Sequence, residues 1–198
     1  SPLRDVYKRQ HTSSYKISSV LKNERPSTVQ DEIRELIESK TVLASYNSTD
    51  PGASLALTKD INKFKLYLSD TGLFVTLMFI DKPFTKNEIY KKLLSNKSEV
   101  NLGMLYENAV ATSLRSLGYD LYFNTSYDED YKKSYELDFL ISSGNKIYPI
   151  EVKSSGYKAH KSLDVFIDKY RSRIGKSFVI YTNCLLYTSL MARGRRVD

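Results

Sequence analysis

The spacing of apolar residues in the second half of the chain predicts helices and strands in alternation. Residues 102–117 place apolar side chains at helical intervals, and Gly118 follows them, where a glycine commonly ends a helix. In chain order, the predicted elements are helix 102–117, strands 119–124, 135–142 and 146–153, helix 163–170 and strand 177–182. This αβββαβ order predicts an α/β core with a mixed sheet.

The first half of the chain has the pattern of a small helical unit with a hairpin. A capping-box signature precedes an amphipathic helix, and two strand-like segments flank a turn-rich loop. The predicted elements are helix 27–38, strand 41–46, loop 47–54 and strand 64–68. That order is typical of a winged helix. We therefore predict a winged-helix unit at 12–80 and a polar linker at 81–100, which makes the protein α+β as a whole.

Both ends of the chain look like translated DNA from a sequencing library. Residues 5–10 would be encoded by GATGTGTATAAGAGACAG and residues 184–189 by TGTCTCTTATACACATCT. These strings are reverse complements shifted by one base, and both resemble a transposon end used to fragment DNA. We therefore expect residues 1–11 and 184–198 to be library artefacts, and the part between them to be an internal piece of a longer protein.

Charge and cysteine content say little about function once these ends are set aside. The whole chain carries a formal charge of +7, each predicted artefact contributes +2, and the remaining +3 is no proof of a nucleic-acid partner. Cys184, the only cysteine, lies in the second artefact, so the rest has no disulfide framework, which suits the cytoplasm. The longest apolar stretch, 73–80, is too short to span a bilayer, and we expect no membrane partner.

Candidate chemistry gathers at a predicted hairpin. Gly144 and Asn145 suit a two-residue loop, because such a loop needs positive φ angles. The register that follows places Ser143 opposite Lys146, Asp138 opposite Glu151, and Glu136 opposite Lys153. Carboxylates directly opposed across two strands repel each other. The predicted pairing of two acidic residues therefore favours a cation between them.

Strand alternation adds a lysine to the two carboxylates. Glu151 and Lys153 share one face of their strand, whereas Ile150 and Val152 point the other way, into the predicted core. We expect the shared face to form a cation site.

Glu107 lies at the edge of the apolar stripe of the helix at 102–117, where a carboxylate is costly unless it is paired. A helix packed on the sheet would aim Glu107 toward the same place. The predicted stripe consists of Leu102, Tyr106, Ala109, Val110, Leu114 and Leu117.

These residues resemble a known family. Asp138, twelve further residues, and then Glu151-Val152-Lys153 are similar to the D-x(n)-E-x-K signature of the PD-(D/E)XK nucleases, whose restriction-endonuclease-like core has the order αβββαβ. More closely, the chain resembles the C-terminal region of a group of AAA-type ATPases, a domain of unknown function numbered 4143 that follows an ATPase module and a winged helix. The similar segments are 64–73, 102–110, 136–141 and 148–154.

The resemblance covers nearly all of residues 12–182 and implies a nuclease-like domain at 101–183. The chain contains no G-x-x-x-x-G-K-[ST] motif, so ATP would bind only in a missing N-terminal module.

The resemblance also implies a role for each candidate residue. Asp138 and Glu151 would bind Mg²⁺, the carbonyl of Val152 would be a further ligand, and Glu107 would complete the shell. Lys153 would steady the scissile phosphate or the attacking hydroxide. The implied reaction is metal-assisted phosphodiester hydrolysis of nucleic acid. Residues implied as possible phosphate contacts are Lys158, His160 and Lys161.

Alternative interpretations remain open for these residues. Glu151 and Lys153 would also suit a solvent-facing strand, Glu107 the edge of a helix, and His160 an ordinary loop. The 16 tyrosines would suit half-buried positions in a sheet as well as base stacking. The alternative function is a non-catalytic module on the same fold that binds nucleic acid or regulates the ATPase, and a third is a protein-interaction domain.

The charge of the helix at 27–38 argues against DNA reading. Four acidic residues outnumber its basic ones, whereas a helix in the major groove needs lysine and arginine against phosphates. We expect this unit to contact the missing ATPase module or another protein. The acidic residues are Asp31, Glu32, Glu35 and Glu38, against Arg34 and nearby Lys40.

Overall fold

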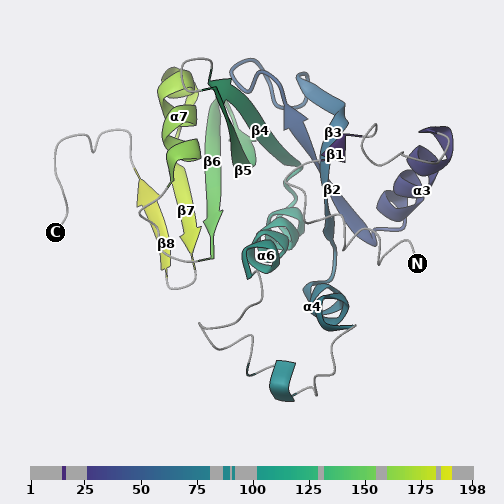
Figure 1. Ribbon diagram of the computed structural model, residues 1–198. Helices are drawn as coiled ribbons and strands as arrows, with labels where there is room; N and C mark the ends of the chain where they lie inside the picture. Colours follow the sequence, from purple (N-terminus) through teal and green to yellow (C-terminus); the bar gives the residue numbers. More distant parts are fainter. Residues whose placement is uncertain are drawn as a thin grey trace. The chain divides into compact units, whose positions relative to one another are not determined.

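A computed structural model describes residues 15–16, 26–80, 87–89, 91, 102–128, 132–154, 160–181 and 184–188, with the backbone alone at 15–16, 26–30, 128 and 184–188. The described elements confirm the predicted helices and strands and add to them (Figure 1). They are β1 (Tyr15–Lys16), α3 (Pro26–Glu38), β2 (Val42–Ser48), β3 (Lys59–Leu68), α4 (Thr71–Phe79), α6 (Leu102–Ser116), β4 (Leu121–Asp128), β5 (Lys133–Ser143), β6 (Lys146–Lys153), α7 (Lys161–Tyr170), the short 3-10 helix η1 (Arg171–Arg173), β7 (Ser177–Tyr181) and β8 (Cys184–Thr188).

The chain forms two compact units that interleave in sequence. The first unit comprises residues 1–44 and 64–118, and the second comprises residues 45–63 and 119–198. In the second unit, β2 pairs in parallel with β4 from Ser45↔Leu121 onward. The domain boundaries predicted at 80 and 101 stay a prediction. The predicted linker at 81–100 lies almost entirely outside the described residues.

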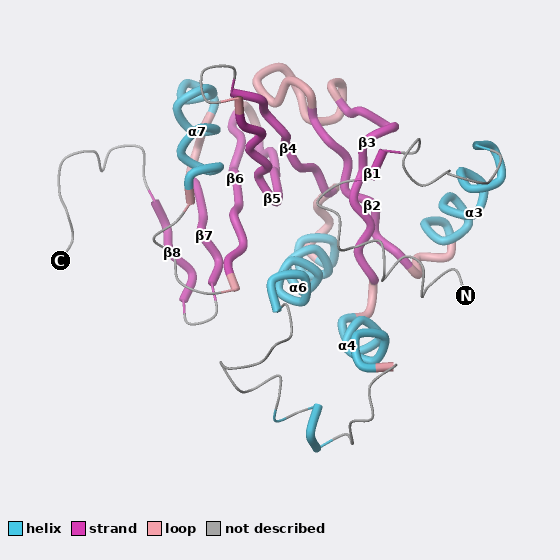
Figure 2. The backbone as a smooth tube through the Cα atoms, in the orientation of Figure 1, coloured by secondary structure: helices cyan, strands magenta, loops and turns pink. Residues whose placement is uncertain are grey.

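The second unit is built on a mixed sheet, as predicted. The strand order of the sheet is β1-β3-β2-β4-β5-β6-β7-β8, and β4 to β8 lie wholly in the second unit. The pairs β2–β4 and β6–β7 are parallel, whereas β4–β5, β5–β6 and β7–β8 are antiparallel (Figure 2). The helices and the mixed sheet make the protein α+β.

β8 lies in a segment that the sequence assigned to an artefact. It pairs with β7 from Ser177↔Thr188 to Tyr181↔Cys184, so the structure continues the sheet through this segment. The transposon origin of residues 184–189 stays a prediction.

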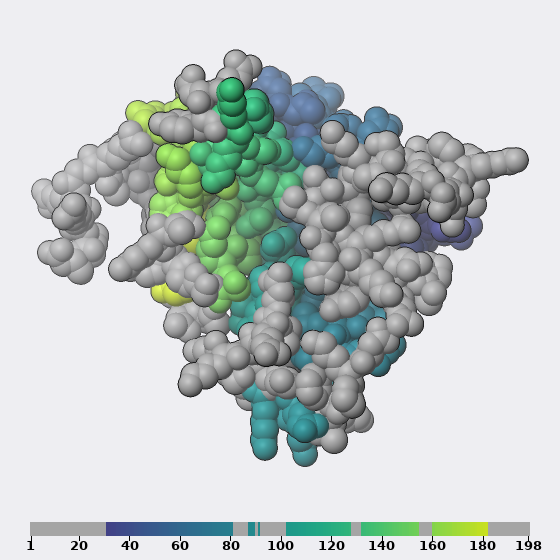
Figure 3. All heavy atoms as spheres, viewed as in Figure 1, coloured from purple at the N-terminus to yellow at the C-terminus, as the bar shows by residue number. Residues whose placement is uncertain are grey.

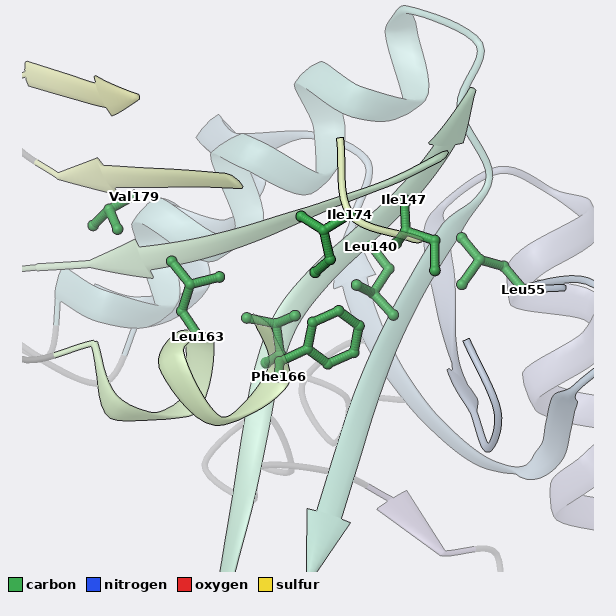
Figure 4. Packing of buried hydrophobic residues seen from close by; sticks show 8 residues of the cluster. Leu55, Leu140, Ile147, Leu163, Phe166, Ile174 and Val179 are labelled. Carbon is green, nitrogen blue, oxygen red and sulfur yellow. The ribbon is translucent and has the colours of Figure 1, made fainter. Parts of the chain in front are cut away.

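Helix α7 packs against β5 and β6 and closes the hydrophobic core of the second unit (Figure 4). Phe166 is buried at the centre of the helix face that meets the sheet, and Tyr170 stacks at a tilt against it. The core cluster is Leu55, Leu137, Leu140, Ile147, Leu163, Phe166, Ile174 and Val179. In the space-filling view, the green to yellow-green segments of this unit form one continuous mass on the visible face (Figure 3).

Helix α4 of the first unit was not predicted. Asp70 caps it by accepting hydrogen bonds from the backbone N–H groups of Gly72 and Leu73. The helix's own apolar residues are spread around its whole circumference, so their spacing shows no helical period. α4 packs against α6 in the same unit. In the described part of the chain, no helix is both long enough and apolar enough to cross a lipid bilayer.

Helix α3 carries its acidic residues on the surface, as its sequence suggested. Asp31, Glu32, Glu35 and Glu38 are all exposed, and Asp31 pairs with Arg34. Lys40 has a φ of +57° just past the helix, which is the left-handed conformation common at a helix end. The winged-helix arrangement of this part stays a prediction.

The buried face of α6 differs from the predicted apolar stripe. Asn108, Ala111 and Leu114 are buried, whereas Leu117 is 73% exposed. Asn108 is tolerated there because its side chain binds the backbone of Leu68 twice. Asn108 Oδ1 accepts from the Leu68 N–H at 2.8 Å, and Asn108 Nδ2 donates to the Leu68 carbonyl at 3.0 Å. The polar residue thus fixes α6 to the end of β3.

Replacing this asparagine tests that attachment. Asn108→Ala leaves a buried N–H and a buried carbonyl of Leu68 without their partners, so we expect the free energy of unfolding to fall by about 2–4 kcal/mol. Urea unfolding followed by circular dichroism measures the change. Ser113→Ala on the exposed side of α6 is the matched control, because Ser113 bonds only within its own helix. Equal losses in the two variants would contradict the assigned role.

The core under α7 gives a second test. Phe166→Ala should lower the free energy of unfolding by about 3–5 kcal/mol, because it empties a fully packed position. Asp168→Ala, on the exposed side of α7, should cost less than about 1 kcal/mol. The same urea titration compares the two variants. A small loss in Phe166→Ala would mean that α7 does not close this core.

Candidate functional site

The hairpin that carries the candidate residues has the predicted register. β5 and β6 pair from Phe139↔Ile150 to Ser143↔Lys146, which places the turn at Gly144 and Asn145. Gly144 has a φ of +57°, a conformation that glycine adopts without strain. The local pattern of turn residues and alternating strands was therefore sufficient to fix the pairing.

A β-bulge interrupts β5 next to Asp138. Tyr122 of β4 faces Leu140, but Asn124 faces Leu137, so β5 has one more residue than β4 between these pairs. Leu137 and Leu140 consequently belong to the same core cluster, although strict alternation would separate them. Bulges of this kind re-aim side chains and are frequent beside active sites.

Two of the predicted β5–β6 residue pairs are absent from the observed ladder next to the bulge. Within the described strands, the β5–β6 ladder ends at Phe139↔Ile150, so Asp138 does not stand opposite Glu151 in a regular pair, and Glu136 does not stand opposite Lys153. Instead, Asp138 Oδ2 accepts a hydrogen bond of 2.7 Å from the backbone N–H of Val152. The Asp138 carboxylate is thereby held at the centre of the Glu151-Val152-Lys153 segment.

Glu151 lies in a buried position of β6. Glu151 lies on the same face of β6 as Ile147, four residues earlier, and it pairs in parallel with Val179. Both Ile147 and Val179 belong to the core cluster that α7 covers. The Glu151 side chain is only 4% exposed. The interpretation of Glu151 as an ordinary solvent-facing residue is therefore wrong. Ile150 and Val152 are also buried, so the strand is covered on both faces.

Lys153 supplies a positive charge to this buried carboxylate. Its Nζ atom lies 2.6 Å from Glu151 Oε1, and its side chain is 30% exposed. A buried carboxylate is stable only when a hydrogen-bonded counter-charge accompanies it. The Lys153 ammonium thus lies directly on the Glu151 carboxylate. A shared site of Asp138, Glu151 and Lys153 stays a prediction.

The side chains of Asp138 and Glu151 and the backbone of Val152 carry donor atoms of the type that a hard divalent cation prefers. Two carboxylates and the Val152 carbonyl supply oxygen, which Mg²⁺ prefers, and this ion usually keeps several waters. Among the described residues, no three His, Cys, Asp or Glu side chains gather closely enough to hold a metal ion. A cation at this hairpin would therefore be held by two carboxylates, the carbonyl and water.

Glu107 lies in the first unit, on α6. Its side chain is 28% exposed, which agrees with a place at the edge of the buried helix face. Lys65 Nζ lies 3.9 Å from Glu107 Oε2, and the Tyr67 hydroxyl donates to the same oxygen at 3.4 Å. Lys65 and Tyr67 were not predicted as partners, although their spacing places both on one face of β3. A shared site for Glu107, Asp138 and Glu151 stays a prediction.

The three predicted phosphate contacts have different outcomes. Lys158 lies outside the described residues. His160 Nδ1 is 3.1 Å from Asp164 Oδ2, a distance that suits an ion pair only when the histidine is protonated, and the orientation does not make a hydrogen bond. Lys161 is exposed at the first residue of α7. Phosphate binding by these residues stays a prediction.

Two tyrosines of the second unit are half-buried sheet residues. Tyr46 of β2 and Tyr122 of β4 are direct partners in the parallel ladder, and burial raises the pKa of both hydroxyls. Lys59 Nζ lies 4.3 Å from the centre of the Tyr46 ring. Both hydroxyls therefore stay protonated at neutral pH, and these two positions favour the structural interpretation of the tyrosines over base stacking.

Comparison with known proteins supports the resemblance for the second half of the chain. No curated protein and no solved structure gives a significant match. Residues 102–189 match the family model described as "Domain of unknown function (DUF4143)", and the matched region includes Glu107, Asp138, Glu151 and Lys153. The region from α6 to β8 is therefore similar to the domain that the sequence motifs indicated.

Proposed function

We propose that the region at 102–189 carries a metal-dependent phosphodiesterase site of the nuclease type. The observation that supports it best is the hydrogen bond from the Val152 N–H to Asp138, because it brings the Asp138 carboxylate beside the Glu151-Val152-Lys153 segment. We propose that this aspartate, Glu151 and Lys153 form one site at the bulged hairpin, as the D-x(n)-E-x-K signature would require.

Each group in this set has a proposed role. Asp138, Glu151 and the Val152 carbonyl would hold Mg²⁺, and Glu107 is proposed as a further carboxylate of the shell. Bound there, Mg²⁺ would make a coordinated water a stronger nucleophile and offset the charge that develops on the phosphate. In the proposed hydrolysis, the oxygen of a water molecule would form a bond to phosphorus while the bond to the leaving sugar oxygen breaks. The water's protons pass to the leaving oxygen and to solvent.

Lys153 would orient the phosphate. Its ammonium is a compact charge on a flexible stem, so it can contact a phosphate oxygen without a change in the backbone. Lys158, His160 and Lys161 are proposed as outer contacts to the nucleic-acid backbone.

The wider context of the proposal comes from the resemblance. The substrate would be nucleic acid, and an ATP-binding module would precede a winged helix in the longer protein. The exposed acidic side of α3 supports contact with that module or with another protein rather than with DNA. A cytoplasmic location is also proposed, because the chain has no cysteine besides Cys184 and so no disulfide framework.

A second candidate is a non-catalytic binding or regulatory module on the same fold. The direct ion pair of Lys153 with Glu151 favours it, because such a pair supplies a counter-charge to the buried carboxylate without any metal. This candidate would retain the hairpin as a structural element. A measurement of DNA cleavage distinguishes the two candidate functions, because only the first predicts cleavage.

The nuclease proposal predicts Mg²⁺-dependent cleavage of DNA at the hairpin. The whole chain should cut plasmid or single-stranded DNA when Mg²⁺ is present, and Asp138→Asn and Glu151→Gln should each cut at least about a hundredfold more slowly, because each removes a charged ligand. Gel electrophoresis of timed samples measures the rates.

The matched control replaces an exposed carboxylate outside the hairpin. Asp168→Asn removes the same charge from α7 and should keep the rate of the natural chain. Cleavage that is equal in all variants would assign the activity to another site or to a contaminant. A folded chain that cuts no DNA would favour the non-catalytic module.

A further inference from the structure

We propose that the Lys153 ammonium is a resident counter-ion, which a divalent cation displaces from Glu151 when it binds. The inference rests on the proposed metal site and concerns how that site exchanges one cation for another. The supporting observation is the distance of 2.6 Å between Lys153 Nζ and Glu151 Oε1, which shows that the ammonium already lies directly on this carboxylate.

Burial explains why the carboxylate needs a cation in either state. The Glu151 side chain is 4% exposed, and a charged carboxylate in such a place is strongly disfavoured unless a positive charge accompanies it. Lys153 provides that charge without a metal. A divalent cation would provide it in the loaded state, so the two cations would compete for the same carboxylate.

The geometry allows the exchange without movement of the backbone. Lys153 stands two residues after Glu151 on the same face of β6, and its side chain is 30% exposed. Its long stem can therefore carry the ammonium to solvent while the strand keeps its pairing with β7. The Glu151 carboxylate remains in place for the incoming ion.

Asp138 differs from Glu151 in this respect. Its Oδ2 atom accepts a hydrogen bond from a backbone amide, which is neutral and stays in place when a metal binds another oxygen of the carboxylate. The proposed displacement therefore moves only the Lys153 ammonium away from Glu151. The exchange also has a functional consequence, because the ammonium becomes available to a phosphate only when the metal has taken its place.

Magnesium affinity tests the exchange directly. In isothermal titration of the whole chain with MgCl₂, Lys153→Met should bind Mg²⁺ about tenfold more tightly than the natural chain, because the ion no longer displaces a charge-assisted hydrogen bond. Lys146→Met is the matched control, since Lys146 lies at the other end of β6 and donates to the backbone carbonyl of Ser172. It should bind Mg²⁺ as the natural chain does.

The stability of the metal-free chain is a second readout. Lys153→Met should melt at a lower temperature than the natural chain without Mg²⁺, and saturating Mg²⁺ should remove most of that difference. An affinity in Lys153→Met that equals or falls below that of the natural chain would overturn the displacement. So would a loss of stability that Mg²⁺ fails to restore.

A measurement on the natural chain covers the case in which Lys153→Met does not fold. With lysine labelled by ¹⁵N, the ammonium signal that is missing in Lys153→Arg belongs to Lys153. Addition of MgCl₂ should shift that signal and speed its hydrogen exchange, because the ammonium moves into water. A signal that stays unchanged at saturating Mg²⁺ would overturn the inference.

Glu151→Gln separates failure of the inference from failure of the proposed function. This variant should lose Mg²⁺ binding. Absent binding in the natural chain, or binding that persists in Glu151→Gln, would reject the metal site itself. Binding that Glu151→Gln removes and Lys153→Met leaves unchanged would reject only the displacement.

Discussion

The burial of one carboxylate within the sheet is the constraint on which the candidate site depends. Glu151 lies on the side of β6 that α7 covers, between Ile147 of its own strand and Val179 of the next. A charge in that place requires a cation, and Lys153 stands close enough to supply one. In the proposed function a metal ion would meet the same need, so structural stability and the proposed chemistry would both depend on the charge of Glu151.

The β-bulge brings the second carboxylate to this place. The bulge lies in the pairing of β5 with β4, and the regular ladder of β5 with β6 ends at Phe139↔Ile150, next to Asp138. At that point, the Asp138 carboxylate binds the amide of Val152. In the first unit, the Asn108 side chain similarly forms hydrogen bonds with the backbone N–H and carbonyl of Leu68, which an apolar side chain could not do. Each unit therefore uses a buried polar contact to fix the element that carries a candidate carboxylate.

Local patterns predicted the parts of this structure that depend on neighbours in sequence. The turn at Gly144 and Asn145 set the hairpin register, and alternation identified Glu151 and Lys153 as residues on one face. The bulge was missed because it arises where β5 must match β4 and β6 in different registers. Asn108 was missed because its partner lies 40 residues away, and helix α4 because an apolar segment without a period gives no helical signal.

We propose that a metal ion binds beside Asp138 and Glu151 in exchange for the Lys153 ammonium. A crystal structure of the whole chain with Mn²⁺, located by its anomalous scattering, tests it most directly. The account predicts one ion in contact with both carboxylates and Lys153 turned away from Glu151. An ion bound elsewhere, or Lys153 still paired with Glu151 beside a fully occupied ion, would contradict it.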